Sequence, residues 1–193
     1  MTRTGIMGAI LAALLLAGCA QAESASVTDL PGDRQPFEGP GLAVGADPGD
    51  VRSIDAIVAA LYDVISGRVG EPRDWNRFRS LFHPQARLIP TGRDEDGDWR
   101  LRAITPEEYI ESSGPVLLEL GFVERELARR THLWGNLAQL FSSYEAFQRG
   151  GDEPFMRGIN AIQLWNDGTR WWVVSIMWQQ ESEEHPLTRE YLR

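Results

Sequence analysis

The folded part of the chain opens with hydrophobic residues at helical spacing. Apolar side chains recur every three or four positions between Asp50, a suitable N-cap, and Gly67, which predicts an amphipathic helix. These positions are Ile54, Ile57, Val58, Leu61, Tyr62 and Ile65. A second, shorter helix is predicted over residues 75–82, and it ends before Pro84 because the residue preceding a proline disfavours helical dihedral angles.

A short hairpin and a third helix follow. The segments ARLIPTG and WRLRAI predict two strands, which the polar turn RDEDGD joins. Thr105 can cap a helix, Pro106 suits its first position, and Glu108 completes a capping box. The dipeptide Gly114-Pro115 predicts a break within this helix.

From Phe122 onward the pattern is typical of long strands. The segments FVERELARRTHLWGN and LAQLFSSYEAFQR are joined near Gly135, and MRGINAIQLW follows a Gly-Gly loop. The turn NDG then leads into TRWWVVSIMWQQES, which makes the strongest hairpin signal in the chain. Helices first, long antiparallel strands last and no regular βαβ alternation predict an α+β domain with helices packed on one curved sheet.

The order of these elements resembles the NTF2-like superfamily, also called SnoaL-like or ketosteroid-isomerase-like. Three strand phrases carry the resemblance, GNLAQLFSSYEAF, RGINAIQLW and RWWVVSIMWQQE. It implies a cone in which a strongly curved antiparallel or mixed sheet wraps around about three N-terminal helices and leaves an apolar pocket. The superfamily includes isomerases, dehydratases, epoxide hydrolases and transport factors, so the fold constrains function poorly.

The last predicted strand is apolar on both faces. Strict alternation gives it one face with Trp172, Val174, Ile176 and Trp178 and another with Trp171, Val173, Ser175 and Met177. The pattern leaves open which face points inward. An apolar outer face of the sheet predicts that another polypeptide segment buries it. Two candidates fit: a second copy in a homodimer, as the resemblance implies, or the chain's own N-terminal segment.

The N-terminus has the three-part plan of an export signal. Arg3 precedes an uncharged run over residues 5–17, which is shorter than the roughly twenty apolar residues that cross a bilayer. The segment LAGC, which ends at Cys19, resembles the lipobox of bacterial lipoproteins and implies cleavage before that cysteine and lipid on its sulfur. The alternative is an ordinary signal peptide that contains Cys19.

Ala20 follows the cysteine, which in the lipoprotein family favours sorting to the outer membrane. We therefore expect a lipid-anchored protein of the bacterial cell envelope, on the periplasmic side of the outer membrane. The predicted organisation has an export signal at 1–18, a disordered tether rich in Pro, Gly, Asp and Ser at 19–49, the NTF2-like domain at 50–182 and a charged C-terminal tail at 183–193.

Composition excludes several kinds of chemistry. The chain has 19 basic and 28 acidic residues, with a net charge of −9, and such an acidic protein is a poor partner for nucleic acid. There is no lysine, which excludes a Schiff-base lysine, a pyridoxal-phosphate site and a Walker A loop. Cys19 is the only cysteine, so lipidation would leave no disulfide, thiol catalyst or cysteine metal site. We expect no cofactor.

The acidic segment RDEDGDW invites comparison with a calcium loop. An EF-hand loop has glycine at its sixth position and glutamate at its twelfth, whereas counting from Asp94 puts Gly97 fourth. The sequence therefore predicts a solvated turn and no metal site.

Two residues are weak candidates for catalysis. His83 ends the second helix, near the cone that the resemblance implies, and imidazole suits proton transfer near neutral pH. The alternative is that His83 caps the helix C-terminus. Tyr144 can donate a hydrogen bond to a carbonyl, as the resemblance to ketosteroid isomerases implies, or it is simply an aromatic residue packed on the sheet.

Four residues are predicted to bind a ligand, namely Arg157, Asn160, Trp178 and Trp134. Arg157 and Asn160 are polar positions in an apolar strand and have opposite parity, so only one of them can face the cavity. Arg157 suits a ligand carboxylate, but an ion pair to Glu145 explains it equally well.

No strand offers an acid that can be assigned as the base of a ketosteroid isomerase. Glu124, Glu126 and Glu145 lie among charged neighbours and are predicted to be exterior. The leading hypothesis is therefore an envelope-anchored lipoprotein that binds a small, partly apolar molecule or a protein partner without a settled catalytic role. The alternative is an isomerase or dehydratase that uses His83 and Tyr144 for proton transfer.

Overall fold

The computed structural model describes residues 45–193. The predicted export signal, Cys19 and most of the predicted tether lie outside the described residues. Regular structure begins with the short helix α2 (Pro48–Val51), slightly before the predicted domain boundary, and the Asp47 side chain caps it by accepting a hydrogen bond from Gly49 N at 2.7 Å. None of the helices that the structure describes has both the length and the apolar character to cross a membrane.

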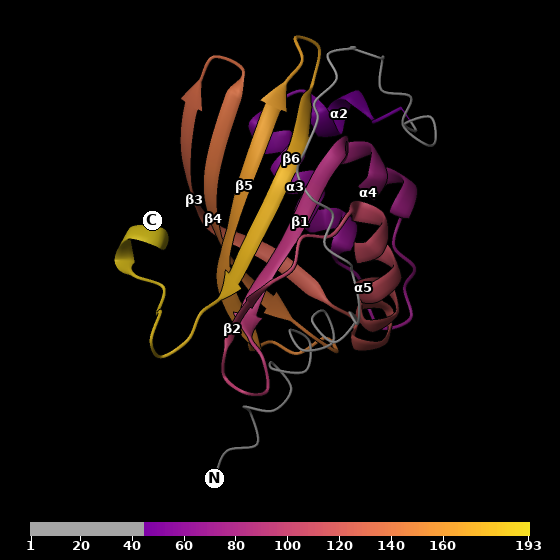
Figure 1. Cartoon of the computed structure of the whole chain (residues 1–193). Coiled ribbons are helices and arrows are strands. Elements are labelled where there is room, and N and C mark those ends of the chain that lie inside the picture. Colours follow the sequence, from indigo (N-terminus) through magenta and orange to yellow (C-terminus); the bar gives the residue numbers. More distant parts are fainter. Residues whose placement is uncertain (1–44) are drawn as a thin grey trace, which may run out of the picture.

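Three longer helices cover one face of a six-stranded curved sheet (Figure 1). The helices are α3 (Ile54–Ile65), α4 (Trp75–Leu81) and α5 (Pro106–Leu120). The strands are β1 (Phe82–Arg93), β2 (Trp99–Leu101), β3 (Val123–Trp134), β4 (Leu137–Phe147), β5 (Met156–Asn166) and β6 (Trp171–Gln180). Their order is β2-β1-β6-β5-β4-β3, in which only the β1–β6 pair is parallel. The predicted α+β fold with a mixed, curved sheet is confirmed.

The helix starts follow local capping chemistry. Ser53, not the predicted Asp50, caps α3 by accepting a hydrogen bond from Ala56 N at 3.1 Å. Asp50 instead pairs with Arg77 at 2.7 Å, and the hydrogen bond from that guanidinium lowers the pKa of the Asp50 carboxyl. The sequence could not show this pairing, because the two residues lie on different helices.

The capping box that was predicted for α5 is present. The Thr105 hydroxyl accepts from Glu108 N at 3.2 Å, and the Glu108 carboxylate accepts from Thr105 N at 2.7 Å. The helix then continues through Pro115 to a left-handed cap at Gly121, so the predicted break is wrong. Burial of Tyr109, Ser113 and Leu117 against the sheet side of the domain explains why the helix tolerates the proline.

A β-bulge in β6 decides which of its side chains point inward. Gln163 pairs with Ser175 and Leu164 with Val173, so Val174 is an extra residue in the register. Trp171, Val173, Ile176 and Trp178 consequently belong to or pack against the core. Strict alternation, which the sequence analysis assumed, is wrong for this strand.

The outer face of the sheet keeps exposed apolar side chains, and the end of the chain covers part of it. The 3-10 helix η1 (Arg189–Tyr191) lies on the side of the sheet away from the helices (Figure 1). The Tyr191 ring is 6.0 Å from that of Phe141, and Ser143 donates a hydrogen bond to the Tyr191 carbonyl. The C-terminal segment that buries this part of the sheet is neither of the two candidates that the sequence suggested. The homodimer stays a prediction.

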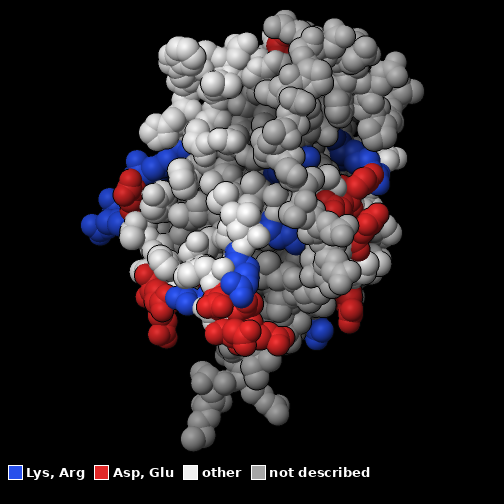
Figure 2. All heavy atoms as spheres, viewed as in Figure 1, with Lys and Arg blue, Asp and Glu red and all other residues white. Residues whose placement is uncertain are grey.

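Acidic and basic side chains are interspersed on the face shown in Figure 2, with acidic groups gathered at its lower end near the β1–β2 turn. Asp94 organises that turn by accepting hydrogen bonds from Asp96 N and Asp98 N, and it pairs with Arg100 at 2.8 Å. Within residues 45–193, no group of three or more His, Cys, Asp or Glu side chains is placed to hold a metal ion.

A buried arginine joins the ends of two helices to the sheet. Arg73 is 8 % exposed, and its guanidinium donates hydrogen bonds to five carbonyls. The acceptors are Ile65 at 2.9 Å, Gly67 at 3.1 Å, Leu117 at 3.1 Å, Phe122 at 3.3 Å, and Glu71. The last carbonyls of a helix lack intrahelical donors, and arginine supplies five N–H groups in a fixed plane. Burial lowers the pKa of Arg73, yet an arginine stays charged.

We expect the substitution Arg73→Met to lower the free energy of unfolding by about 3–5 kcal/mol, because five hydrogen bonds from one charged group are lost at once. Urea denaturation measures this. Arg79→Met is the control, since the exposed Arg79–Glu107 ion pair is worth roughly 0–1 kcal/mol. Equal losses in the two variants would contradict the role assigned to Arg73.

Candidate functional site

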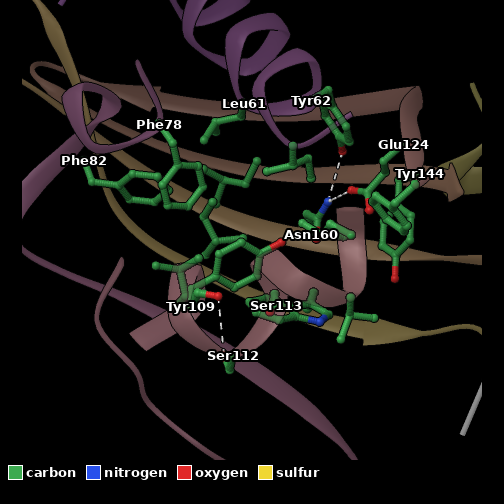
Figure 3. Close-up of a pocket in the computed structure, with 18 of the residues that line it drawn as sticks. Leu61, Tyr62, Phe78, Phe82, Tyr109, Ser112, Ser113, Glu124, Tyr144 and Asn160 are labelled. Carbon is green, nitrogen blue, oxygen red and sulfur yellow. Dashed lines mark hydrogen bonds between the residues drawn. The ribbon is translucent and has the colours of Figure 1, made fainter. Parts of the chain in front are cut away.

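A cavity of about 110 Å³ lies between the helices and the inner face of the sheet (Figure 3). Its walls are mostly apolar and include Leu61, Phe78, Phe82, Leu88, Ile162 and Ile176. The Phe78 and Tyr109 rings stack with centroids 5.4 Å apart, and Trp178 meets Tyr109 edge-on at 6.3 Å. The aromatic side chains therefore form a continuous wall from α4 through α5 to β6.

Glu124 brings a carboxyl group into this apolar cavity. It pairs across the sheet with the buried Ala146, so it shares the inner face with that residue. Its side chain keeps partial exposure as part of the cavity wall, and its carboxylate accepts a hydrogen bond from Asn160 Nδ2 at 3.1 Å. No arginine of the described chain pairs with it. Burial raises the pKa of Glu124 from 4.5 to about 7, although the bond from Asn160 opposes this.

The end of α3 fixes the backbone of Glu124. The Ser66 hydroxyl accepts from Glu124 N at 3.0 Å, and it lies 3.2 Å from the Glu124 carbonyl and 2.6 Å from that of Tyr62. The carbonyl of Phe122, two residues earlier, accepts from Gly67 N at 2.8 Å and from Arg73. The first residues of β3 are thus held against the helix that carries Tyr62.

A directed chain of hydrogen bonds starts at Asn160. The Ser142 hydroxyl donates to Glu126, and its single hydrogen is then used. Tyr62 must therefore be the donor in its 2.7 Å contact with Ser142, so the Tyr62 oxygen accepts from Asn160 Nδ2 at 3.2 Å. Both amide hydrogens of Asn160 are used, one for Tyr62 and one for Glu124 (Figure 3). This fixes the orientation of the amide.

Burial keeps the tyrosines of the site neutral. It raises the pKa of Tyr62, Tyr109 and Tyr144 above the usual value of 10, and the charge of Glu124 adds to the effect in each case. Tyr62 donates to Ser142, so the phenol donors that the cavity offers are those of Tyr109 and Tyr144, together with one carboxyl that can act as acid or base near neutral pH.

Tyr144 lines the cavity as an aromatic residue packed on the sheet. It is 2 % exposed and lies across from Gly158, its partner on β5. A Cβ at position 158 would come within 2.7 Å of the Tyr144 oxygen and 2.3 Å of the Gln179 carbonyl. The tyrosine ring thus occupies the space that a side chain at 158 would need, which is the alternative role that the sequence allowed.

His83 lies elsewhere. Its ring is 5.8 Å from Trp165 and 6.0 Å from Trp172, and its Nδ1 accepts a hydrogen bond from Gln85 N at 3.2 Å. It does not line the cavity that contains Tyr144. The structure does not bring His83 and Tyr144 together, so the hypothesis of a catalytic His83–Tyr144 pair is wrong.

Two of the four predicted ligand-binding residues, Asn160 and Trp178, line the cavity. Arg157 does not, because its parity directs it outward, where it pairs with Glu181 at 2.8 Å. Trp134 lies at the end of β3 and is 82 % exposed. Neither residue can contact a molecule in the cavity.

Two of the three acidic residues that were predicted to be exterior on β3 and β4 face inward. Glu124 and Glu126, predicted to be exterior, lie on the inner face, whereas Glu145 is turned outward and pairs with Arg125 at 2.5 Å instead of Arg157. A bulge between Glu126 and Ala128 shifts the register of this hairpin by one residue. Unshifted pairing from the turn near Gly135 would set Glu124 on the opposite face.

No family model and no curated protein matches this sequence. Among solved structures, a protein of unknown function with a cystatin-like fold from Nostoc punctiforme superposes with a TM-score of 0.52 at 11 % identity, over 67 % of this chain and 90 % of that one. An NTF2-like protein of unknown function from Silicibacter pomeroyi gives 0.45 at 15 % identity, over 67 % and 94 %.

A third structure, an NTF2-like protein from Cytophaga hutchinsonii, gives a TM-score of 0.44 at 10 % identity, over 64 % of this chain and 88 % of that one. The first superposition shows that the described domain shares the cystatin-like fold of the Nostoc protein, and its curved mixed sheet with helices on one face is the architecture that the resemblance to the NTF2-like superfamily implied. At these identities the likeness concerns the fold alone, and function has to come from the site.

The raised pKa of Glu124 predicts a pH-dependent stability. The folded protein binds this proton more tightly than the unfolded chain, so the contribution of Glu124 is complete below pH 4.5 and is lost as the pH rises through about 7. One pKa unit corresponds to about 1.4 kcal/mol, which makes the loss on the order of 3 kcal/mol. Urea denaturation between about pH 5 and pH 8 should show this decline in the wild type and not in Glu124→Gln.

Glu145→Gln is the control, because Glu145 lies on the outer face beside Arg125. Its stability profile should decline with pH as the wild type does. A decline of the same size in Glu124→Gln would show that Glu124 is not the titrating group.

Proposed function

We propose that the protein binds a small, mainly apolar molecule in the cavity and holds it through an oxygen atom near Glu124. The observation that carries this proposal is a carboxyl group in an apolar cavity with an amide, and no cation, as its partner. Burying such a group costs several kcal/mol, and the cost is reduced when a bound molecule completes its hydrogen bonds. The site therefore has the composition of a ligand pocket.

The size of the cavity limits the ligand. A cavity of about 150 Å³ holds benzene in a well-studied engineered protein. At about 110 Å³, this cavity is smaller, so it suits a short chain and not a substituted ring. Larger guests would need the walls formed by α4 and α5 to move.

The charges around the cavity disfavour an anionic ligand. The lining contains Glu124 and no arginine or histidine, so an anionic ligand would meet no opposite charge. When protonated, Glu124 donates to a carbonyl oxygen, and its other oxygen stays bonded to Asn160. Ketones and aldehydes with an apolar body match these requirements.

Filling the cavity should abolish binding. Val116 lines the cavity, and we expect Val116→Trp to weaken the binding of 2-butanone by more than about tenfold, as measured by isothermal titration calorimetry. Val123→Trp is the matched control, because the same residue type on β3 is exposed and lies outside the cavity. Equal affinities of the two variants would rule out binding in this cavity.

We also propose that the protein is anchored to the bacterial cell envelope through lipid on Cys19. The support is the lipobox-like segment that ends at this cysteine, the apolar run before it, and the Pro- and Gly-rich segment that follows. A tether of about thirty flexible residues would let the domain reach roughly 30 Å from the membrane.

Labelling with radioactive palmitate in a bacterial host tests the anchor. The wild-type chain should incorporate label and fractionate with the outer membrane, and Cys19→Ala should do neither. Ser24→Ala, a neighbouring change of similar size, should behave as the wild type. Unlabelled wild-type protein would leave only the alternative of an ordinary signal peptide.

A further inference from the structure

One hydroxyl in the cavity wall has no hydrogen-bond partner. Ser113 lies in the middle of α5, is 6 % exposed, and lines the cavity. Its Oγ is buried and makes no hydrogen bond to any residue that the structure describes. A buried hydroxyl without a partner costs about 1–3 kcal/mol, so such groups are rare unless another molecule satisfies them.

The neighbouring serine shows that the helix itself can satisfy a hydroxyl. Ser112, which also lines the cavity, donates to the Glu108 carbonyl one turn earlier at 2.6 Å. Ser113 is in the same helix and makes no such bond. The missing hydrogen bond is therefore a property of the position of Ser113 beside the cavity, and not of serine residues in α5 in general.

Ser113 and Glu124 belong to different walls. Ser113 comes from α5, Glu124 comes from β3, and Figure 3 shows Asn160 between them in this view. The aromatic wall of Phe78, Tyr109 and Trp178 provides the apolar surface of the same cavity. A molecule that satisfies both polar groups must carry two oxygen atoms on an apolar body.

We propose that Ser113 is a second polar anchor, and that the ligand is a small molecule with a carbonyl oxygen at Glu124 and a hydroxyl or second carbonyl at Ser113. This inference rests on the proposed function and adds the class of ligand. The serine hydroxyl can donate or accept, so it does not decide between a hydroxyl and a carbonyl at that end. The body between the two oxygens is limited to a short chain.

A matched pair of probes tests the second anchor. 2-Butanone carries one oxygen, and 4-hydroxy-2-butanone adds a hydroxyl at the opposite end of the same short chain. We expect the full-length wild-type protein to bind the hydroxylated probe about threefold to tenfold more tightly by calorimetry, which is the contribution of one neutral hydrogen bond. Ser113→Ala should bind both probes equally, and Ser112→Ala should keep the preference.

Equal binding of the two probes by the wild type, or a preference that survives in Ser113→Ala, would overturn the inference and leave the proposed function intact. Binding of neither probe would overturn both. The melting temperature of the unliganded protein gives an independent measurement. Ser113→Ala should melt no lower than the wild type, whereas Ser112→Ala loses the bond to Glu108; a clear decrease for Ser113→Ala would show that its hydroxyl is bonded within the protein.

Discussion

The domain depends on a single buried cation at the place where its helices end. Arg73 donates hydrogen bonds to the C-terminal carbonyls of α3 and α5 and to the turn that enters β3, where the carbonyls of Leu117 and Phe122 also accept from backbone N–H groups. Gly67 is required beside it, since a Cβ there would lie 2.4 Å from the guanidinium. Arg73 thereby joins the ends of α3 and α5 to the start of β3, and Leu117 and Phe122 at this junction line the cavity.

The same arrangement explains how the fold tolerates an acid among apolar side chains. Glu124 follows the segment that Arg73 holds, and Ser66 fixes its backbone, so the carboxyl cannot turn to solvent without disturbing the start of β3. Asn160 is fixed in turn by the chain through Tyr62 and Ser142 to Glu126. The chain ends at Glu126, which pairs with Arg129 at 3.2 Å, whereas the partner of Glu124 in the cavity is the neutral amide of Asn160.

The fold could be predicted from the sequence and most of the site could not. Hydrophobic spacing, the Thr105 capping box and the NDG turn are local signals, and they gave the elements in the right order. The site depends on two bulges, near Leu127 and at Val174, which reverse the facing of Glu124 and of the first half of β6. A single extra residue reverses the predicted facing of every side chain beyond it in the strand. No local signal in the charged segment ERELARR predicts this extra residue.

The contact between Tyr144 and Gly158 has a consequence for the evolution of this domain. A side chain at 158 would meet the Tyr144 ring and also the backbone carbonyl of Gln179, at 2.3 Å. A smaller residue at 144 would therefore not make room for it, and we expect chains related by descent to keep glycine at 158 even where residue 144 has changed. Such a retained glycine would record how closely the neighbouring backbone approaches β5 at this point.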